Sequence, residues 1–168
     1  SQVVYENLPL AQLEEHFDEI MSSAYSVSLF TDWQDDSIDQ VWLKHRGDYA
    51  ATDVTRELAG AAMAQRDLHP VAGISAQSCT KQMGVAGPWH DRLPHFRMGF
   101  TPSSGDELQS EYFVPRQHAV AALRAVRGLR DQLAPLILTS EVRCVAGDSL
   151  WMSPCYRQDS VAIHFTLK

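Results

Sequence analysis

The chain has 168 residues, of which 45% are hydrophobic and 21% charged, and a formal net charge of −7 at pH 7. This length is typical of one domain, and the composition excludes a disordered or fibrous chain. Because the positive residues are scattered along an acidic chain, we expect no basic surface for nucleic acid.

The first third of the chain predicts one helix and two strands. Residues 8–22 place apolar side chains at helical spacing, with Asn7 as a candidate N-cap and Pro9 in the first turn. Residues 25–30 and 38–45 are rich in β-branched and aromatic side chains and are separated by a polar stretch. We expect these two segments to pair like a hairpin.

Regular patterns are weakest between residues 50 and 102. An Ala-rich stretch predicts a short helix over residues 54–64, and the glycines and prolines that follow predict a long irregular segment. Loops of this length are uncommon in a compact domain unless they serve a function. Covering a site is a frequent function of such loops, and the sequence leaves the role of residues 65–102 open.

The last third of the chain shows clear patterns again. Residues 107–114 predict a strand that ends at Pro115, and residues 116–133 predict a helix. The apolar stripe of this helix consists of Val120, Leu123, Val126, Leu129 and Leu133. Residues 136–145 and 161–167 predict two more strands. Together these elements indicate an α+β fold with a mostly antiparallel sheet and helices packed on one face.

Alternation along the last two strands separates polar from apolar side chains. It puts Glu141 and Arg143 on one face of the first strand, and His164 and Thr166 on one face of the second. The opposite face of the first strand is expected to carry Leu136, Leu138, Ser140 and Val142. If the strands are neighbours, an acid, a cation, an imidazole and a hydroxyl gather on one face, which suits a polyhydroxylated ligand. The alternative is a solvent-exposed face with an ordinary Glu–Arg pair.

The remaining residue patterns argue against metal and membrane sites. Three cysteines, Cys79, Cys144 and Cys155, follow no CxxC or Cys/His spacing, which favours reduced thiols in a cytoplasmic protein. The histidines form no HxH or HExxH arrangement, so we expect no metal. No apolar run approaches the roughly 18 residues that span a bilayer, and the first residues lack a signal pattern.

Six stretches spread over nearly the whole chain resemble the cap domain of bacterial alditol oxidases, which are flavoproteins of the vanillyl-alcohol-oxidase type. They are YENLPL, MSSAYSVSLFTDW, ISAQSCTKQMGVAGPWHDRLPHF, TPSSGDELQSEYFVPR, SEVR and LWMSPCYRQDSVAIHFTLK. The resemblance implies that residues 1–168 form the substrate-binding cap of a two-domain enzyme. The FAD-binding domain of such an enzyme is absent from this chain.

The resemblance also implies an activity. Alditol oxidases such as xylitol oxidase oxidise the terminal CH–OH of an alditol, for example xylitol or sorbitol, to an aldose and pass the electrons through FAD to O2, which yields H2O2. The expected partners are an alditol, O2 and the chain's own FAD-binding domain. Since FAD would be bound by that domain, we expect residues 1–168 alone to be colourless and inactive.

Within the family, E-x-R and H-x-T pairs on adjacent cap strands line the substrate pocket, and they match Glu141, Arg143, His164 and Thr166. We expect His164 to act as the base and Arg143 to hold the reacting oxygen. We expect Glu141 to orient Arg143 or accept ligand hydroxyls, and Thr166 to contact a distal hydroxyl. The family also uses a lysine further along the chain, which is not equated with Lys168.

Two other functions fit the same residues. An aldonolactone oxidase of the arabinono- or gulono-1,4-lactone type is a related flavoprotein that shares much of the H-x-T and E-x-R face. A stand-alone carbohydrate-binding module without catalysis would also need such a face. Peroxide production from xylitol rather than from a lactone separates the two enzymes, and a flavin-binding half in the same reading frame excludes the module.

Overall fold

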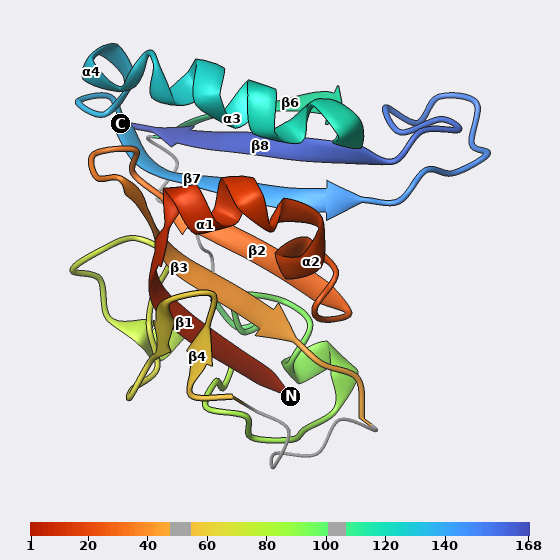
Figure 1. The fold of residues 1–168 in the computed structure, drawn as a ribbon. Coiled ribbons are helices and arrows are strands. Elements are labelled where there is room, and N and C mark those ends of the chain that lie inside the picture. Colours follow the sequence, from red (N-terminus) through yellow and green to blue (C-terminus); the bar gives the residue numbers. More distant parts are fainter. Residues whose placement is uncertain (48–54, 101–106) are drawn as a thin grey trace.

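A computed structural model describes residues 1–47, 55–100 and 107–168 of the chain. In these residues, an antiparallel sheet of eight strands forms the frame of the molecule. Its strand order is β4-β5-β1-β3-β2-β7-β8-β6 (Figure 1). The strands are β1 (Gln2–Pro9), β2 (Ser26–Thr31), β3 (Ser37–Lys44), β4 (Glu57–Leu58), β5 (Ala61–Met63), β6 (Leu108–Pro115), β7 (Ile137–Val145) and β8 (Ser160–Leu167). The predicted α+β class and the predicted pairing of β2 with β3 are confirmed.

Strand β1 corrects the prediction for the start of the chain. It lies between β3 and β5 in the sheet, so Val3 packs into the core on one face while Val4 packs into a second cluster on the other. A strand that is buried on both faces shows no alternation, and the sequence pattern therefore did not reveal it. Asn7 is not an N-cap, because it lies inside β1 with φ of 61° and the helix begins at Leu10.

In the described ranges, four α-helices lie on one face of the sheet. They are α1 (Leu10–Glu15), α2 (Phe17–Met21), α3 (Ala119–Arg127) and α4 (Arg130–Leu133), and a 3-10 turn, η4 (Arg116–His118), precedes α3. Both predicted helices are therefore interrupted, the first at His16, where φ is −117° and ψ is 27°. The second is interrupted at Gly128 and Leu129, where Leu129 leaves helical geometry with φ of −101° and ψ of 6°. No helix in the described ranges is long and apolar enough to cross a membrane.

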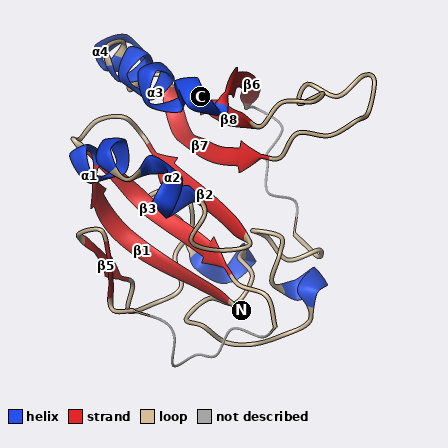
Figure 2. Cartoon of the chain, turned by 45° about the vertical axis from the view of Figure 1, so that its right-hand side comes forward, coloured by secondary structure: helices blue, strands red, loops and turns tan. Residues whose placement is uncertain are grey.

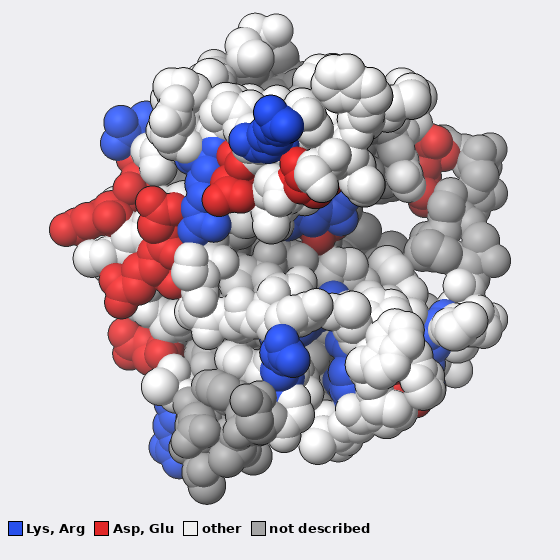
Figure 3. Space-filling model, turned by 90° about the vertical axis from the view of Figure 1, so that its right-hand side faces the viewer, with Lys and Arg blue, Asp and Glu red and all other residues white. Residues whose placement is uncertain are grey.

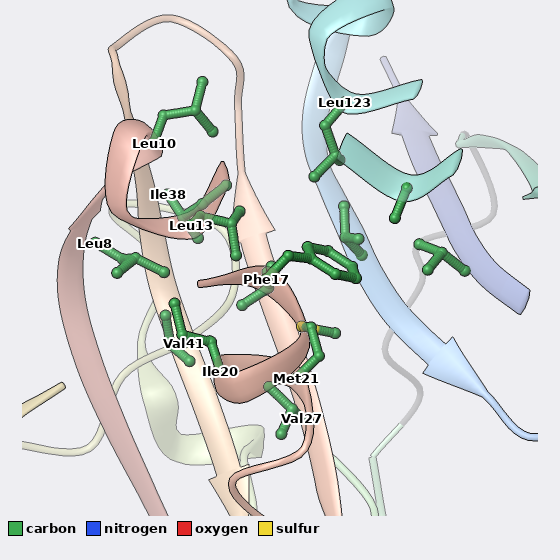
Figure 4. Packing of buried hydrophobic residues seen from close by; sticks show 14 of the residues in the cluster. Leu8, Leu10, Leu13, Phe17, Ile20, Met21, Val27, Ile38, Val41 and Leu123 are labelled. Carbon is green, nitrogen blue, oxygen red and sulfur yellow. The ribbon is translucent and has the colours of Figure 1, made fainter. Parts of the chain in front are cut away.

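The main hydrophobic core lies between these helices and the sheet. Figure 4 shows Leu13, Phe17 and Ile20 pointing from α1 and α2 toward β2 and β3, and Leu123 entering from α3. Full burial of a leucine side chain contributes about 2 kcal/mol to folding. Leu129 corrects the predicted stripe, because the break before α4 turns its side chain outward and leaves it 48% exposed.

Arginines on the outer side of the second helical segment pair with acidic residues from the first part of the chain. Arg116 contacts Asp18 at 2.7 Å, and Arg124 contacts Glu14 at 2.8 Å. Asp36 accepts from two more arginines, at the end of α3 and in α4. In the upper part of Figure 3, basic and acidic side chains lie next to one another. These exposed pairs connect the second helical segment to α1, α2 and the turn between β2 and β3. Each pair adds little stability.

The other face of the sheet is covered by an irregular segment, residues 64–100 (Figure 2). Only two 3-10 turns, η2 (Ala76–Ser78) and η3 (Trp89–Asp91), are regular within it. The predicted helix over residues 54–64 is wrong from Thr55 onward, because the chain forms the β4–β5 hairpin there. Residue 54, the first of the predicted helix, lies outside the described ranges. Ala59 and Gly60 both have positive φ, which is the geometry of a tight hairpin turn.

Candidate functional site

The candidate site starts from one row of side chains across four neighbouring strands. Register places Glu141 of β7 directly opposite His164 of β8, and His164 opposite Glu111 of β6. On the other side, Glu141 is opposite Phe30 of β2. The predicted antiparallel pairing of the last two strands is therefore present, and it sets His164 between two carboxylates.

A second row adds hydroxyl and amide groups to the same face. Thr166 of β8 lies opposite Thr139 of β7 and Gln109 of β6. The register of β7 shifts between Ile137 and Thr139, and Leu138 lines the pocket next to Thr139. Strict alternation had placed Leu138 on the helix face, and the β-bulge overturns that prediction.

These rows form the floor of a pocket of about 400 Å3. The irregular segment forms the opposite wall. The lining residues are Phe30, His69, Pro70, Val71, Ile74, Ser78, His95, Phe96, Glu107, Gln109, Leu138, Thr139, Glu141, His164 and Thr166. A volume of this size accommodates a small ligand, and a mostly apolar lining with a few converging polar groups is typical of such sites. The sequence left the role of residues 65–102 open; within the described part of this stretch, as far as residue 100, the segment contributes the wall of the pocket.

Glu141 is a buried carboxylate with several polar contacts. Its Oε1 atom lies 3.1 Å from His95 Nε2, and its Oε2 atom lies 3.5 Å from Arg143 Nη1. Burial alone would raise the pKa of Glu141, but the hydrogen bonds from His95 and Ser28, together with the charges of Arg143 and of His95 when it is protonated at acid pH, outweigh burial and lower it to about 2. Glu141 is therefore ionised and acts as a hydrogen-bond acceptor.

His95 lines the pocket and Lys44 contacts it from behind the lining, and sequence reasoning missed both residues. His95 Nδ1 lies 3.1 Å from Lys44 Nζ, and Lys44 also donates to the carbonyl of Leu93. Strand alternation could not find His95, because it lies in the irregular segment. The only available signal was its place within the stretch WHDRLPHF, which contributes to the family resemblance.

Arg143 lies at the border of the pocket rather than inside its lining. Its guanidinium forms an ion pair with Glu111 and a longer contact with Glu141, and 41% of its side chain is exposed. The structure therefore brings Glu141, His164 and Thr166 together in one pocket, with Arg143 beside it. Glu111 is a further acidic group of the site that sequence reasoning missed.

A larger hollow of about 570 Å3 is lined in part by Lys44. Its lining includes Ser1, Tyr25, Trp89 and Arg92. Arg92 is already bonded there to the carbonyls of Val85 and Ala86. The smaller pocket is the better candidate. Of the two, it alone brings a carboxylate, imidazoles and hydroxyls together.

The pocket has the donors and acceptors needed to bind a chain of hydroxyl groups. Carboxylates accept from hydroxyls, threonines both donate and accept, and an imidazole can exchange a proton. Within the described ranges, no group of three or more His, Cys, Asp and Glu residues is arranged to hold a metal ion. The site is therefore suited to binding a polyol and to proton transfer.

Comparison with known proteins agrees with this chemistry. No family model matches the chain. The chain is 52% identical over 165 residues to an alditol oxidase from a Streptomyces species. The match covers 98% of the chain but only 38% of that relative. Identity at this level over nearly the whole chain confirms the resemblance to alditol oxidases, and the chain is homologous to part of one.

Proposed function

We propose that the chain is the substrate-binding cap domain of an FAD-dependent alditol oxidase, which oxidises the terminal CH–OH of alditols such as xylitol or sorbitol and reduces O2 to H2O2. The observation that carries the proposal is the convergence of Glu141, His164 and Thr166 in one pocket of a chain so similar to an alditol oxidase. The exposed-face alternative explains the polar row less well, because an irregular segment covers it.

His164 is proposed as the base that accepts the hydroxyl proton. Two other histidines line the pocket, but both ring nitrogens of His95 are engaged, and His69 Nδ1 accepts from the backbone N–H of Val71 at 3.0 Å. The imidazole of His164 has no hydrogen-bond partner among the described residues. It is therefore the imidazole best able to receive a proton from a ligand, and histidines exchange protons near neutral pH.

Arg143 and Glu141 are proposed to bind and orient the reacting end of the alditol. A guanidinium next to the pocket can stabilise negative charge that develops on the oxygen as its proton leaves. The Glu141 carboxylate can accept a hydrogen bond from a neighbouring hydroxyl. Thr166 lies in the second row and is proposed to bind a hydroxyl further from the reacting carbon.

FAD would supply the hydride acceptor in this reaction. The chain contains no Gly-rich phosphate-binding loop, so we propose that FAD is held by the part of the enzyme that corresponds to the remainder of the relative. The chain's own residues would then orient the alditol, exclude water and take the proton. A purified chain of residues 1–168 should show no flavin absorption, and a stoichiometric flavin band would contradict this division of roles.

Substrate preference tests the proposal directly. A flavoprotein that contains this segment should release peroxide with xylitol and not with arabinono-1,4-lactone. Thr166→Ala should raise the xylitol KM with little change in kcat, because a contact far from the reacting carbon binds ground and transition states alike. Peroxide from the lactone alone would favour the aldonolactone oxidase instead. Binding of xylitol without any flavin-dependent turnover would favour a carbohydrate-binding module.

A further inference from the structure

A buried series of polar contacts runs from β3 to β7 beside the pocket. Lys44 Nζ contacts His95 Nδ1, and His95 Nε2 contacts Glu141 Oε1, each at 3.1 Å. Lys44 is 4% exposed and Glu141 8% exposed. Burial of such groups is unfavourable unless they are paired, so their arrangement needs an explanation beyond packing.

The two contacts determine where the proton of His95 resides. An ammonium group can only donate hydrogen bonds, so the Nδ1 atom that faces Lys44 must accept. In a neutral imidazole the other nitrogen then carries the proton, and Nε2–H donates to the carboxylate of Glu141. Lys44 is itself held by its bond to the carbonyl of Leu93.

The charges around His95 agree with this tautomer. Lys44 faces it from β3, and Glu141 and Arg143 face it from β7. Burial lowers the pKa of His95, and the charge of Lys44 lowers it further, against the opposing effect of Glu141. Burial also lowers the pKa of Lys44 to about 8. At neutral pH, His95 is therefore neutral while most of Lys44 stays charged.

Aromatic rings hold the imidazole plane in place. The rings of Phe30 and Trp42 each lie 5.3 Å from the His95 ring, in edge-to-face geometry. Trp42 is fixed in turn by a hydrogen bond to Gln40 at 2.8 Å. The direction of Nε2–H is therefore set by packing as well as by Lys44.

We propose that His95 is a positioning residue for Glu141: the imidazole, oriented by Lys44, holds one carboxylate oxygen so that the other faces Arg143 and the ligand. This inference rests on the proposed function at one point, namely that Glu141 contacts the alditol. A hydroxyl that enters the pocket then meets an acceptor that is already ionised and oriented, which lowers the ordering needed on binding.

Nitrogen-15 NMR of the histidine rings in the chain tests the tautomer without any substrate. At pH 7, His95 should be neutral and carry its proton on Nε2. Lys44→Met should make His95 titrate at a higher pH than in the parent chain, because the neighbouring cation is gone. A protonated ring or a proton on Nδ1 at pH 7 in the parent chain would overturn the proposal.

Two substitutions at His95 test its role in a flavoprotein that contains this segment. His95→Leu removes the donor and should raise the xylitol KM about 10-fold, the effect expected for a lost hydrogen bond to a charged group. The ratio of the xylitol KM of His95→Leu to that of the parent should also increase toward pH 5, since burial without the donor raises the pKa of Glu141. His95→Gln should restore most of the affinity, because its amide nitrogen can donate to Glu141 and its oxygen can accept from Lys44.

The outcomes separate this inference from the proposed function. Circular dichroism establishes that both variants are folded. Equal KM values for His95→Gln and His95→Leu, or an unchanged KM in His95→Leu, would overturn the positioning role. A flavoprotein that fails to oxidise any alditol would overturn the proposed function, whereas the NMR result would still decide the state of His95.

Discussion

The two faces of the sheet are built from different chemistry. On the helix face, α1, α2 and α3 cover a continuous apolar cluster. On the other face, the irregular segment covers a small apolar cluster together with buried polar residues such as Gln82, Lys44 and Glu141. Apolar burial is non-directional and stabilises the fold, whereas each buried polar group requires a partner in a defined position. The second face therefore provides the oriented groups that a binding site needs.

The largest stability effect is expected on the helix face. Leu123 is fully buried, and Leu123→Ala should lower the free energy of unfolding by about 3 kcal/mol, since it removes apolar contacts and leaves a cavity. Urea unfolding measures this loss. Leu129→Ala, in the break between α3 and α4 and exposed, is the matched control and should change stability by less than about 0.5 kcal/mol. Equal losses would show that α3 is not packed as described.

A slightly smaller loss is expected from a polar residue on the other face. Gln82 is fully buried, and its side-chain amide bonds both the N–H and the carbonyl of Leu68. Gln82→Met should lower the free energy of unfolding by about 2 kcal/mol, because two backbone groups lose their partner. The exposed Gln77→Met is the control. If thermal unfolding finds both variants equally stable, the irregular segment is not held by this amide.

The smallest of these stability effects should be a gain, at the end of the β2–β3 hairpin. Burial, with the charges of Asp32 and Asp35, raises the pKa of Asp39 to about 6. Because the folded state then binds this proton more tightly than the unfolded state, stability falls as the pH rises from about 4 to about 6. Asp39→Asn should therefore stabilise the chain by about 1 kcal/mol at pH 7, after allowance for solvent screening. The gain should vanish at pH 4, and a gain that is independent of pH would contradict the assignment.

The same contrast explains what the sequence could predict. Alternation in β8 identified His164 and Thr166 because strand side chains change faces at every residue. The helix stripe identified Leu123 for the corresponding reason. Strand β1 escaped detection because both of its faces are buried, and Leu138 was misplaced because a β-bulge leaves no signature in a single sequence.

His95 shows where such reasoning ends. Its partner Glu141 lies 46 residues away, and the segment that carries His95 has no periodicity. Only tertiary packing brings the imidazole onto the sheet, so no local pattern contains that information. The family resemblance directed attention to this segment, but it did not single out the residue.

Anaerobic stopped-flow reduction of the flavin by xylitol tests the central claim most directly, with two neighbouring residues on opposite faces of β8. His164→Ala should slow flavin reduction at least roughly 100-fold with little change in stability, as expected for a lost base. Ile163→Val, on the helix face, should lower stability by about 1 kcal/mol and leave the reduction rate unchanged. Reduction at the parental rate in His164→Ala, or a comparable loss of rate in Ile163→Val, would contradict the assignment of the site to the polar face.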